Sequence, residues 1–352
     1  MFEKSTWIRL PRNVVVGHEV LADAGEVVSD LHLQGRPLVV TSPTPRQVAG
    51  DRLVEQFTAD GHEPEVVVVD EASFASVERV IEAAEAADPG FLIGVGGGKA
   101  IDIAKMASDH LHMAFVSVPT AASHDGIVSG RGSVPEGDTR HSVAAEPPMA
   151  VIADTGIIAD APWELTTAGC ADIISNYTAV KDWRLANRLQ GVEYSEYAAA
   201  LAEMTAEMLV DNAQSIRPGL EETAWIVVKA LVSSGVAMSI AGSSRPASGA
   251  EHLFSHQLDR IAPGRALHGH QVGVGTIMVE FLHTGEKGNW RAVRDALASI
   301  DAPTTAEELG VSADEVVEAL TTAHEIRDRY TILGNGMSES AAREVAAKTG
   351  VI

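Results

Sequence analysis

The stretch F91-L-I-G-V-G-G-G-K-A-I-D-I-A-K105 decides the fold, because an apolar run breaks into three glycines and then resumes at helical spacing. Residues 91–95 predict a short buried strand, and the apolar residues from Ile101 onward predict a helix. Glycines at such a junction let backbone N–H groups approach a bound group, and a helix N-terminus favours an anion. The stretch predicts either a phosphate- or pyrophosphate-binding turn or a turn that only packs closely.

Apolar runs alternate with helical patterns around this stretch. Predicted strands cover residues 37–41, 65–70, 91–95 and 112–118, and predicted helices cover residues 46–60, 74–87 and 99–109. Such alternation predicts an α/β domain with a doubly wound, Rossmann-like parallel sheet. Ligands of these sheets bind at the carboxyl ends of the strands, where the glycines and the loop 119–129 fall. Asp70 also ends a strand, where a carboxylate either binds a ribose hydroxyl or only forms a turn.

The periodicity of the apolar residues changes near Pro162, where long helical patterns replace strand-like runs. Residues 131–158 predict a hairpin and a final strand, A150-V-I-A153, before the boundary. An all-α domain follows, with helices predicted over 194–212, 222–241, 269–282, 290–299, 312–327 and 338–348. We therefore expect an α/β domain over residues 1–161 and a helical domain over residues 162–352.

Composition limits the classes of protein and their compartment. The 352 residues are 45% hydrophobic, which suffices for two packed domains. Cys170 is the only cysteine, so an intrachain disulfide and a four-cysteine metal site are both excluded. The N-terminus lacks the apolar region of a signal peptide. We expect no membrane span, because no segment shows the roughly 20 apolar residues that a membrane helix needs. We expect a cytoplasmic protein.

The charge is strongly acidic. The chain has 49 Asp and Glu against 26 Lys and Arg, for a net charge of −23. Nucleic acid is therefore an unsuitable partner. Lysine is scarce, with seven residues in all, and an acidic, lysine-poor surface repels itself unless salt screens it. The composition indicates either a halophilic protein or an acidic protein that is indifferent to salt.

Histidine and aspartate in the helical half suggest a metal centre. Asp172 lies among apolar neighbours, His252 and His256 are four residues apart, and His268 and His270 follow. Two imidazoles and one carboxylate suit Zn²⁺ or Fe²⁺ and leave a position for water or substrate. An aspartate of this kind also caps helices, and paired histidines also hydrogen-bond locally. Spacing alone does not choose among the four histidines.

Several segments resemble known families. The G-G-G-K-A-I-D-I-A-K run is similar to the G-G-G-[ST]-x-x-D-x-x-K element of the iron-containing alcohol dehydrogenase superfamily, with Lys99 in place of a small hydroxyl residue. Within that superfamily, the chain resembles the archaeal sn-glycerol-1-phosphate dehydrogenase family more specifically. The segments that carry it are P11-R-N-V-V-V-G-H-E-V-L21, V118-P-T-A-A-S-H-D-G-I-V-S129, G249-A-E-H-L-F-S-H-Q-L-D259, A266-L-H-G-H-Q-V-G-V-G-T276 and R329-Y-T-I-L333.

The resemblance implies roles for individual residues. It places a catalytic Zn²⁺, with Fe²⁺ as the alternative, on Asp172, His252 and His268. Substrate would contact Asp125, Asp172 and His256, with His256 and Asp125 as catalytic candidates for proton transfer. NAD(P)H would bind at Gly96, Gly97, Gly98, Lys99, Ala100, Ile101, Asp102, Thr120, Ala121, Ala122, Ser123 and Ser129.

The implied reaction is reduction of the phosphorylated triose dihydroxyacetone phosphate to sn-glycerol-1-phosphate, for archaeal ether-lipid synthesis. Polarisation of the ketone by the metal ion would assist hydride transfer. Arg245 either grips the substrate phosphate or lies exposed in its Ser-Gly loop. The alternatives are a glycerol dehydrogenase, with an unphosphorylated substrate, a dehydroquinate-synthase-like lyase, and a nucleotide-binding protein without catalysis. We also expect a homo-oligomer.

Overall fold

A six-stranded parallel sheet forms the centre of the first half of the chain in the computed structural model, which describes residues 7–136 and 139–352. The strand order is β1-β8-β5-β4-β2-β3, and every pairing in this sheet is parallel. Its strands are β1 (Asn13–Gly17), β2 (Pro37–Thr41), β3 (Glu65–Val68), β4 (Phe91–Gly96), β5 (Ala114–Pro119) and β8 (Ala150–Asp154). The central strands are fully buried, as a sheet covered on both faces requires.

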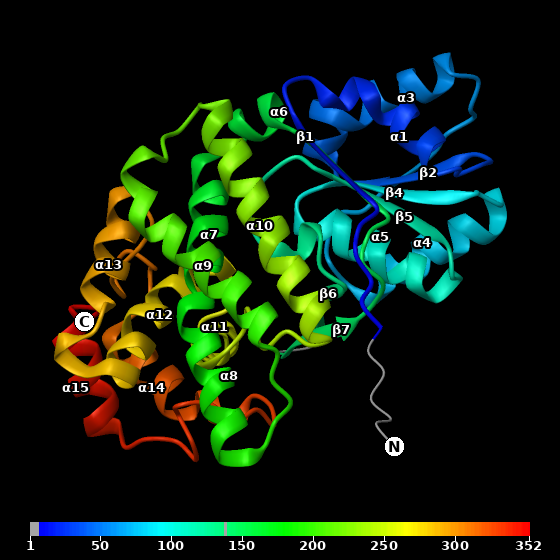
Figure 1. Ribbon diagram of the computed structural model, residues 1–352. Helices are drawn as coiled ribbons and strands as arrows, with labels where there is room; N and C mark the ends of the chain where they lie inside the picture. The colour runs from blue at the N-terminus through cyan, green and yellow to red at the C-terminus, as the bar shows by residue number, and fades with distance from the viewer. Residues whose placement is uncertain (1–6, 137–138) are drawn as a thin grey trace. The chain divides into compact units, whose positions relative to one another are not determined.

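Helices cover both faces of this sheet (Figure 1). One face carries α1 (Ala24–Asp30) and α3 (Asp51–Ala59), and the other carries α4 (Phe74–Ala87) and α5 (Gly98–Leu111). Successive residues of β4 point to opposite faces, so Ile93 joins one apolar cluster with Phe57 of α3. On the other face a Cβ at Gly94 would lie 3.2 Å from the Cα of Ile101, so glycine lets α5 pack closely. This arrangement confirms the expected doubly wound α/β fold.

Shorter elements connect these strands and helices. They are η1 (Val20–Asp23), α2 (Pro43–Pro45), a π-helical turn η2 (Arg46–Gly50), η3 (Asp125–Ile127) and α6 (Thr155–Ala159). The strands β6 (Arg131–Glu136) and β7 (Thr139–Ala144) form a separate antiparallel pair, as the predicted hairpin requires. The tip of that hairpin at residues 137–138, like the N-terminal residues 1–6, lies outside the described part of the chain.

The strand β1 was not predicted by the apolar pattern. It pairs in parallel with β8, with Asn13 opposite Ala150, at one edge of the sheet. None of its five residues is fully buried, in contrast to those of the central strands, and its apolar run is only the three valines at residues 14–16. The other predicted strands agree with the observed ones to within two residues at each end.

The rest of the chain is helical. The helices are α7 (Trp163–Ile174), α8 (Asn176–Gln190), α9 (Glu196–Asn212), η4 (Ala213–Ser215), α10 (Glu221–Ala241), α11 (Ala250–Ile261), α12 (His268–Thr284), η5 (Gly285–Lys287), α13 (Trp290–Ser299), α14 (Ala313–Thr322), η6 (Ala323–Glu325) and α15 (Glu339–Thr349). Serine hydroxyls cap the N-termini of several of these helices. Ser312 and Glu315 form a reciprocal capping box at α14, and Ser195 and Ser338 cap α9 and α15.

Internal contacts divide the chain into two units. The first extends to Thr166 and takes in Pro218–Gly235, and the second comprises Thr167–Arg217 and Val236–Ile352. The sequence suggested a single division after residue 161. Most of α10 groups with the sheet because Glu221 accepts hydrogen bonds from Thr155 and His18, and Ser234 donates to Asp125. The division into functional domains stays a prediction.

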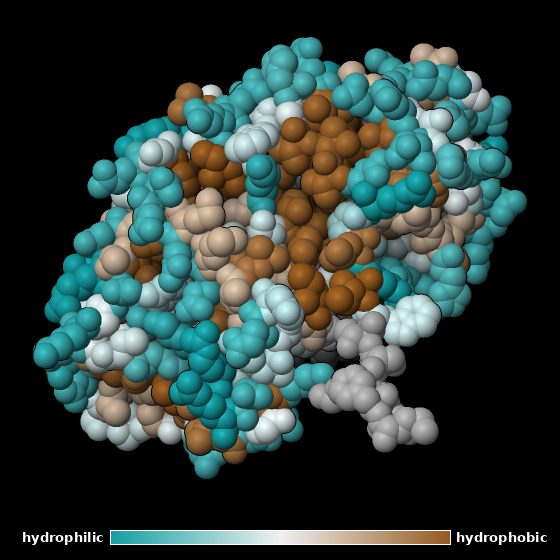
Figure 2. Space-filling view, viewed as in Figure 1, coloured by the Kyte–Doolittle hydropathy of each residue, from teal (hydrophilic) through white to brown (hydrophobic). Residues whose placement is uncertain are grey.

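Helix α10 contradicts the expectation that no segment is long and apolar enough to span a membrane. It is 21 residues long and apolar enough to meet the length and composition of a membrane span, and no other described helix does. Hydrophobic side chains gather over it in Figure 2. A core helix passes the same test, and 44% of the apolar window is buried within the protein. The finding is therefore weak support for a membrane span.

Candidate metal centre and nucleotide-binding edge

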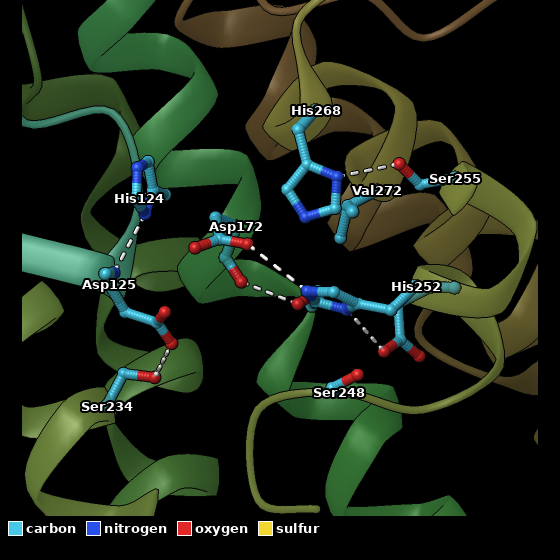
Figure 3. A network of polar contacts seen from close by, with 12 residues as sticks. His124, Asp125, Asp172, Ser234, Ser248, His252, Ser255, His268 and Val272 are labelled. Carbon is cyan, nitrogen blue, oxygen red and sulfur yellow. Dashed lines mark hydrogen bonds and ion pairs between the residues drawn. The ribbon is translucent and has the colours of Figure 1, made fainter. Parts of the chain in front are cut away.

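Three side chains predicted to bind a metal ion meet within the second unit (Figure 3). Asp172 comes from α7, His252 from α11, and His268 is the first residue of α12. Each offers one ligand atom, and these atoms all lie within 4.8 Å of one another. Asp172 and His252 are buried, whereas His268 is partly exposed. The arrangement gives one carboxylate oxygen and two imidazole nitrogens with access from one side.

Glycines in α12 bring the three helices close together. A Cβ at Gly269 would lie 2.0 Å from the carbonyl oxygen of Ala168 in α7, so no other residue fits there without moving a helix. One and two turns further on, Gly273 faces Ala171 of α7, and Gly275 faces the backbone of Glu251 in α11. The H-G-H-Q-V-G-V-G motif is thus a packing motif that places His268 beside Asp172 and His252.

The donor set fits a divalent metal ion. Two ligand atoms roughly 2 Å from a shared tetrahedral ion lie roughly 3.4 Å apart. The Nε2 atom of His252 lies 3.5 Å from Oδ1 of Asp172, which is the separation such an ion requires. Two nitrogens and one oxygen suit Zn²⁺ or Fe²⁺ and leave a coordination position open.

The electrostatics of the site favour positive charge. Burial lowers the pKa of His252, but hydrogen bonds with Asp172 and Glu251 outweigh burial and raise that pKa to about 9. Glu251 is fully buried, and its Oε1 lies 3.0 Å from Nδ1 of His252. Burial opposes ionisation of Glu251, yet its contacts with His252 keep the pKa of the carboxyl below its usual value. A proton or a metal ion beside His252 is therefore stabilised by two carboxylates.

A hydrogen-bonded chain orients His268. Its Nδ1 lies 2.9 Å from Oγ of Ser255, and Ser255 donates to Oε1 of Gln271 at 2.7 Å (Figure 3). Gln271 in turn donates to Asp259 at 2.9 Å, which fixes the orientation of its amide. Since the serine hydrogen is used on Gln271, Ser255 accepts from Nδ1–H of His268. The Nε2 atom of His268 then keeps its lone pair, as a metal ligand requires.

The two remaining histidines take different positions. The ring of His256 stacks on that of His268, with centroids 5.4 Å apart and planes at 23°. His270 lies instead beside Thr167, with its Nε2 2.8 Å from the hydroxyl oxygen. His256 is therefore next to the metal-binding group, and His270 is not a member of it. Sequence spacing could not separate these cases, because residues 268 and 270 point to different sides of the helix.

The glycine turn lies at the carboxyl end of β4, in the first unit. Gly96 has φ of +152°, a conformation that favours glycine, and a Cβ at Gly97 would meet nothing within 4 Å. Gly97 precedes α5 without a side-chain cap, so the first amide groups of this 14-residue helix are available to an anion. A Cβ at Gly98 would lie 1.9 Å from Nε2 of His124, which packs over the start of the helix.

Other predicted nucleotide contacts surround this turn. The backbone of Thr120 bonds to that of Gly96 at 3.0 Å, which holds residues 120–123 beside the glycines. Lys99 donates to the carbonyl oxygen of Asp70 at 2.6 Å, so it binds a neighbouring loop. Ser129 is buried, and its hydroxyl has no hydrogen-bond partner in the described residues.

Asp102 has a structural partner. Its Oδ1 lies 3.3 Å from Nζ of Lys105, and its Oδ2 accepts from the backbone of Ser133. Lys105 is fully buried and also donates to the carbonyl oxygens of Gly126 and Arg131, both at 2.6 Å. Its pKa is lowered, since burial outweighs the attraction of Asp102. A nucleotide contact from the Asp102 side chain stays a prediction without support from these contacts.

The predicted substrate contacts lie in both units. Asp125 accepts a hydrogen bond from Ser234 at 3.0 Å, and the two side chains appear together in Figure 3. Asp172 and His256 belong to the second unit. Arg245 is half-buried and donates to the carbonyl oxygen of Tyr330 at 3.5 Å, so its contact with a phosphate stays a prediction.

Sequence reasoning missed the residues that support the ligands. Glu251, Ser255 and Gln271 were absent from the predicted site, as was His124. One signal was present for Glu251. An acidic residue directly next to a predicted histidine ligand indicates a carboxylate that supports the imidazole.

Comparison with known proteins gives matches over the whole chain. The chain is 80% identical over 352 residues to the NAD(P)+ glycerol-1-phosphate dehydrogenase of Halobacterium salinarum, covering 100% of both chains. It is 56% identical over 350 residues to that of Methanothrix thermoacetophila, covering 99% of this chain and 98% of the relative. Residues 15–162 match the iron-containing alcohol dehydrogenase family.

Solved structures share the fold. Glycerol dehydrogenase from Schizosaccharomyces pombe superposes with a TM-score of 0.82 at 20% identity, covering 99% of this chain and 91% of that one. Sulfoacetaldehyde reductase from Bifidobacterium kashiwanohense, solved with NAD+, gives a TM-score of 0.77 at 14% identity, with 98% and 99% covered. At these identities the likeness shows the fold alone.

Proposed function

The chain belongs to the NAD(P)+-dependent glycerol-1-phosphate dehydrogenase family, and from this premise we propose that it reduces dihydroxyacetone phosphate to sn-glycerol-1-phosphate with NAD(P)H and a bound metal ion. Identity of 80% over both full lengths carries the proposal. The convergence of Asp172, His252 and His268 supports it independently, because the reaction needs an electrophile at the substrate carbonyl.

The metal would be held by Asp172, His252 and His268. When bound, Zn²⁺ or Fe²⁺ supplies Lewis-acid polarisation of the substrate ketone. The protein contributes the geometry of the ligands. Glu251 holds His252 and Ser255 holds His268, each through the Nδ1 atom of the ring. Both rings would then offer Nε2 to the metal ion beside Asp172. The partial exposure of His268 leaves room for the substrate oxygen.

The nucleotide would bind at the β4–α5 turn. We propose that the amides of Gly98, Lys99 and Ala100 hold the pyrophosphate, supported by the open position at Gly97. When bound, the nicotinamide supplies the hydride that reduces C2. Lys99 replaces a small hydroxyl residue of the superfamily pattern, which removes one side-chain contact and leaves the backbone donors in place.

The proton for the product hydroxyl would come from His256 or Asp125. We favour His256, since an imidazole exchanges protons near neutral pH more readily than an ordinary carboxylate. Its stacking on His268 holds it beside the metal ligands. His256→Ala is expected to lower kcat and to flatten the pH profile, and unchanged turnover at every pH would move the role to Asp125.

The biological setting follows from the product. We propose a role in archaeal ether-lipid synthesis, in the cytoplasm, with the enzyme acting as a homo-oligomer. Hydrogen bonds of Glu221 with Thr155 and of Ser234 with Asp125 join α10 to the rest of the first unit, which favours a helix of the folded protein over a membrane span. Glycerol dehydrogenase is the nearest alternative, since that enzyme shares the fold.

A comparison of substrates tests the proposal. NADH or NADPH oxidation would be followed at molar KCl with dihydroxyacetone phosphate and, separately, with dihydroxyacetone. We expect rapid oxidation with the phosphorylated substrate, and a product that an sn-glycerol-3-phosphate dehydrogenase does not oxidise. Activity with dihydroxyacetone alone would assign a glycerol dehydrogenase instead.

A further inference from the structure

We propose that Glu251 is a positioning residue of the metal centre, which fixes the ring of His252 and adds a second negative charge to that of Asp172, so that the two balance a divalent ion. This inference rests on the metal site proposed above. Glu251 is not one of the three candidate metal ligands, and it acts through Nδ1 of His252.

Contacts on both sides of the carboxylate hold Glu251 in place. Its side chain is fully buried, with 0% exposure. Oε1 accepts from the backbone N–H of Gly249 and lies 3.0 Å from Nδ1 of His252. Oε2 accepts from the hydroxyl of Thr178 in α8 at 2.8 Å. The backbone of Gly249 and the hydroxyl of Thr178 thus fix the carboxylate before any metal binds, and the carboxylate in turn contacts the imidazole of His252.

The contact with Nδ1 determines which nitrogen of His252 faces the metal. A carboxylate can only accept, so Nδ1 carries the hydrogen and Nε2 keeps its lone pair. Nε2 lies 3.5 Å from Oδ1 of Asp172 and belongs to the metal-binding group. A carboxylate in this position also raises the basicity of the ligating imidazole, as outer partners of metal-bound histidines do.

The charge of Glu251 also matters for the ion. Asp172 and Glu251 are both buried, and together they carry two negative charges against neutral imidazoles. One divalent ion balances them, whereas burying unbalanced charge is costly. His268 has a neutral partner, Ser255, so the second charge comes from the His252 side alone.

A purely structural role is the competing explanation, since Glu251 also anchors Thr178 and Gly249. Glu280 provides a matched control because it is another fully buried glutamate in the same unit, and its carboxylate pairs with Lys181 at 2.6 Å. If burial and packing were all that mattered, Glu251→Gln and Glu280→Gln would behave alike.

The experiment measures Zn²⁺ affinity rather than turnover. Metal-free full-length protein, wild-type and variant, would compete with a chromophoric chelator for Zn²⁺ at molar KCl, with circular dichroism to establish folding. We expect Glu251→Gln to bind Zn²⁺ about 10- to 100-fold more weakly, and Glu280→Gln to bind it as wild-type does. Glu251→Asp keeps the charge but withdraws it from Nδ1, so it should also weaken binding.

The outcomes separate this inference from the proposed function. Wild-type affinity in a folded Glu251→Gln or Glu251→Asp variant would overturn the role of Glu251. Equal weakening in Glu280→Gln would also overturn it, because the loss would then be structural. Failure of the wild-type protein to take up one equivalent of Zn²⁺ would instead overturn the proposed metal centre itself.

Discussion

Replacing the buried Lys105 with methionine tests how the segment of residues 126–131 is held. Lys105 is fully buried, and its ammonium group donates to the carbonyl oxygens of Gly126 and Arg131 and pairs with Asp102 at 3.3 Å. Methionine fills nearly the same space without a donor. The change therefore leaves two carbonyl groups and one carboxylate in the interior without their partner.

The structure sets the size of the effect. Removing one member of a buried ion pair costs about 3–5 kcal/mol, because the other charge stays buried. The side chain of Asp102 is 5% exposed and retains the hydrogen bond from Ser133, so some of its charge remains stabilised. We expect Lys105→Met to lower the free energy of unfolding by about 3–5 kcal/mol, and Lys105→Met/Asp102→Asn to lose less than the sum of the two single changes.

Urea denaturation at molar KCl measures these energies from the shift of the midpoint at constant slope. A cost for Lys105→Met near 1 kcal/mol, the value of an ordinary net hydrogen bond, would refute the reasoning. Additive costs in the double variant would show that Lys105 and Asp102 do not interact.

Three further changes have defined outcomes. Gly269→Ala should destabilise the protein by about 3 kcal/mol in urea and weaken Zn²⁺ binding, because the new Cβ would lie 2.0 Å from the carbonyl oxygen of Ala168. Gly97→Ala is the control for stability, because the space around its new Cβ is open. His268→Ala should abolish stoichiometric Zn²⁺ uptake in equilibrium dialysis, whereas His270→Ala should retain it, since His270 binds Thr167 instead. Raising KCl from about 0.1 M to about 1 M shortens the screening length from about 10 Å to about 3 Å. The midpoint of urea denaturation should therefore rise markedly for a chain with a net charge of −23, and an unchanged midpoint would contradict the halophilic interpretation.

The sequence pattern predicted the strands correctly where both faces of the strand are covered by helices. The run at residues 91–95 is apolar throughout because β4 lies between two helical layers, and its glycines precede α5 as predicted. The edge strand β1 escaped prediction because its apolar run is only three valines long, and none of its residues is fully buried. Helix α10 was predicted over residues 222–241, within one residue of its observed start, but its resemblance in composition to a membrane span was not recognised from the sequence.

The candidate metal-binding group, Asp172, His252 and His268, contains information that the sequence pattern alone did not provide. Spacing offered four histidines, and only the resemblance preferred His268 to His270. The distinction depends on the packing of α12 on α7, which Gly269 permits and which sequence periodicity does not contain. Supporting contacts such as Glu251 with His252 join a side chain to its own neighbour in sequence, yet they depend on a third residue, Thr178, that lies 73 positions away.

The most direct test of the account is a Zn²⁺ titration of the metal-free enzyme with dihydroxyacetone phosphate and NADPH or NADH at molar KCl. The account predicts negligible oxidation of the nucleotide without metal, and a rate that rises linearly and reaches its plateau at one Zn²⁺ per chain. Asp172→Ala should stay inactive throughout the titration. Full activity in the metal-free enzyme, or an Asp172→Ala variant that responds to Zn²⁺ as the wild-type does, would contradict the central claim.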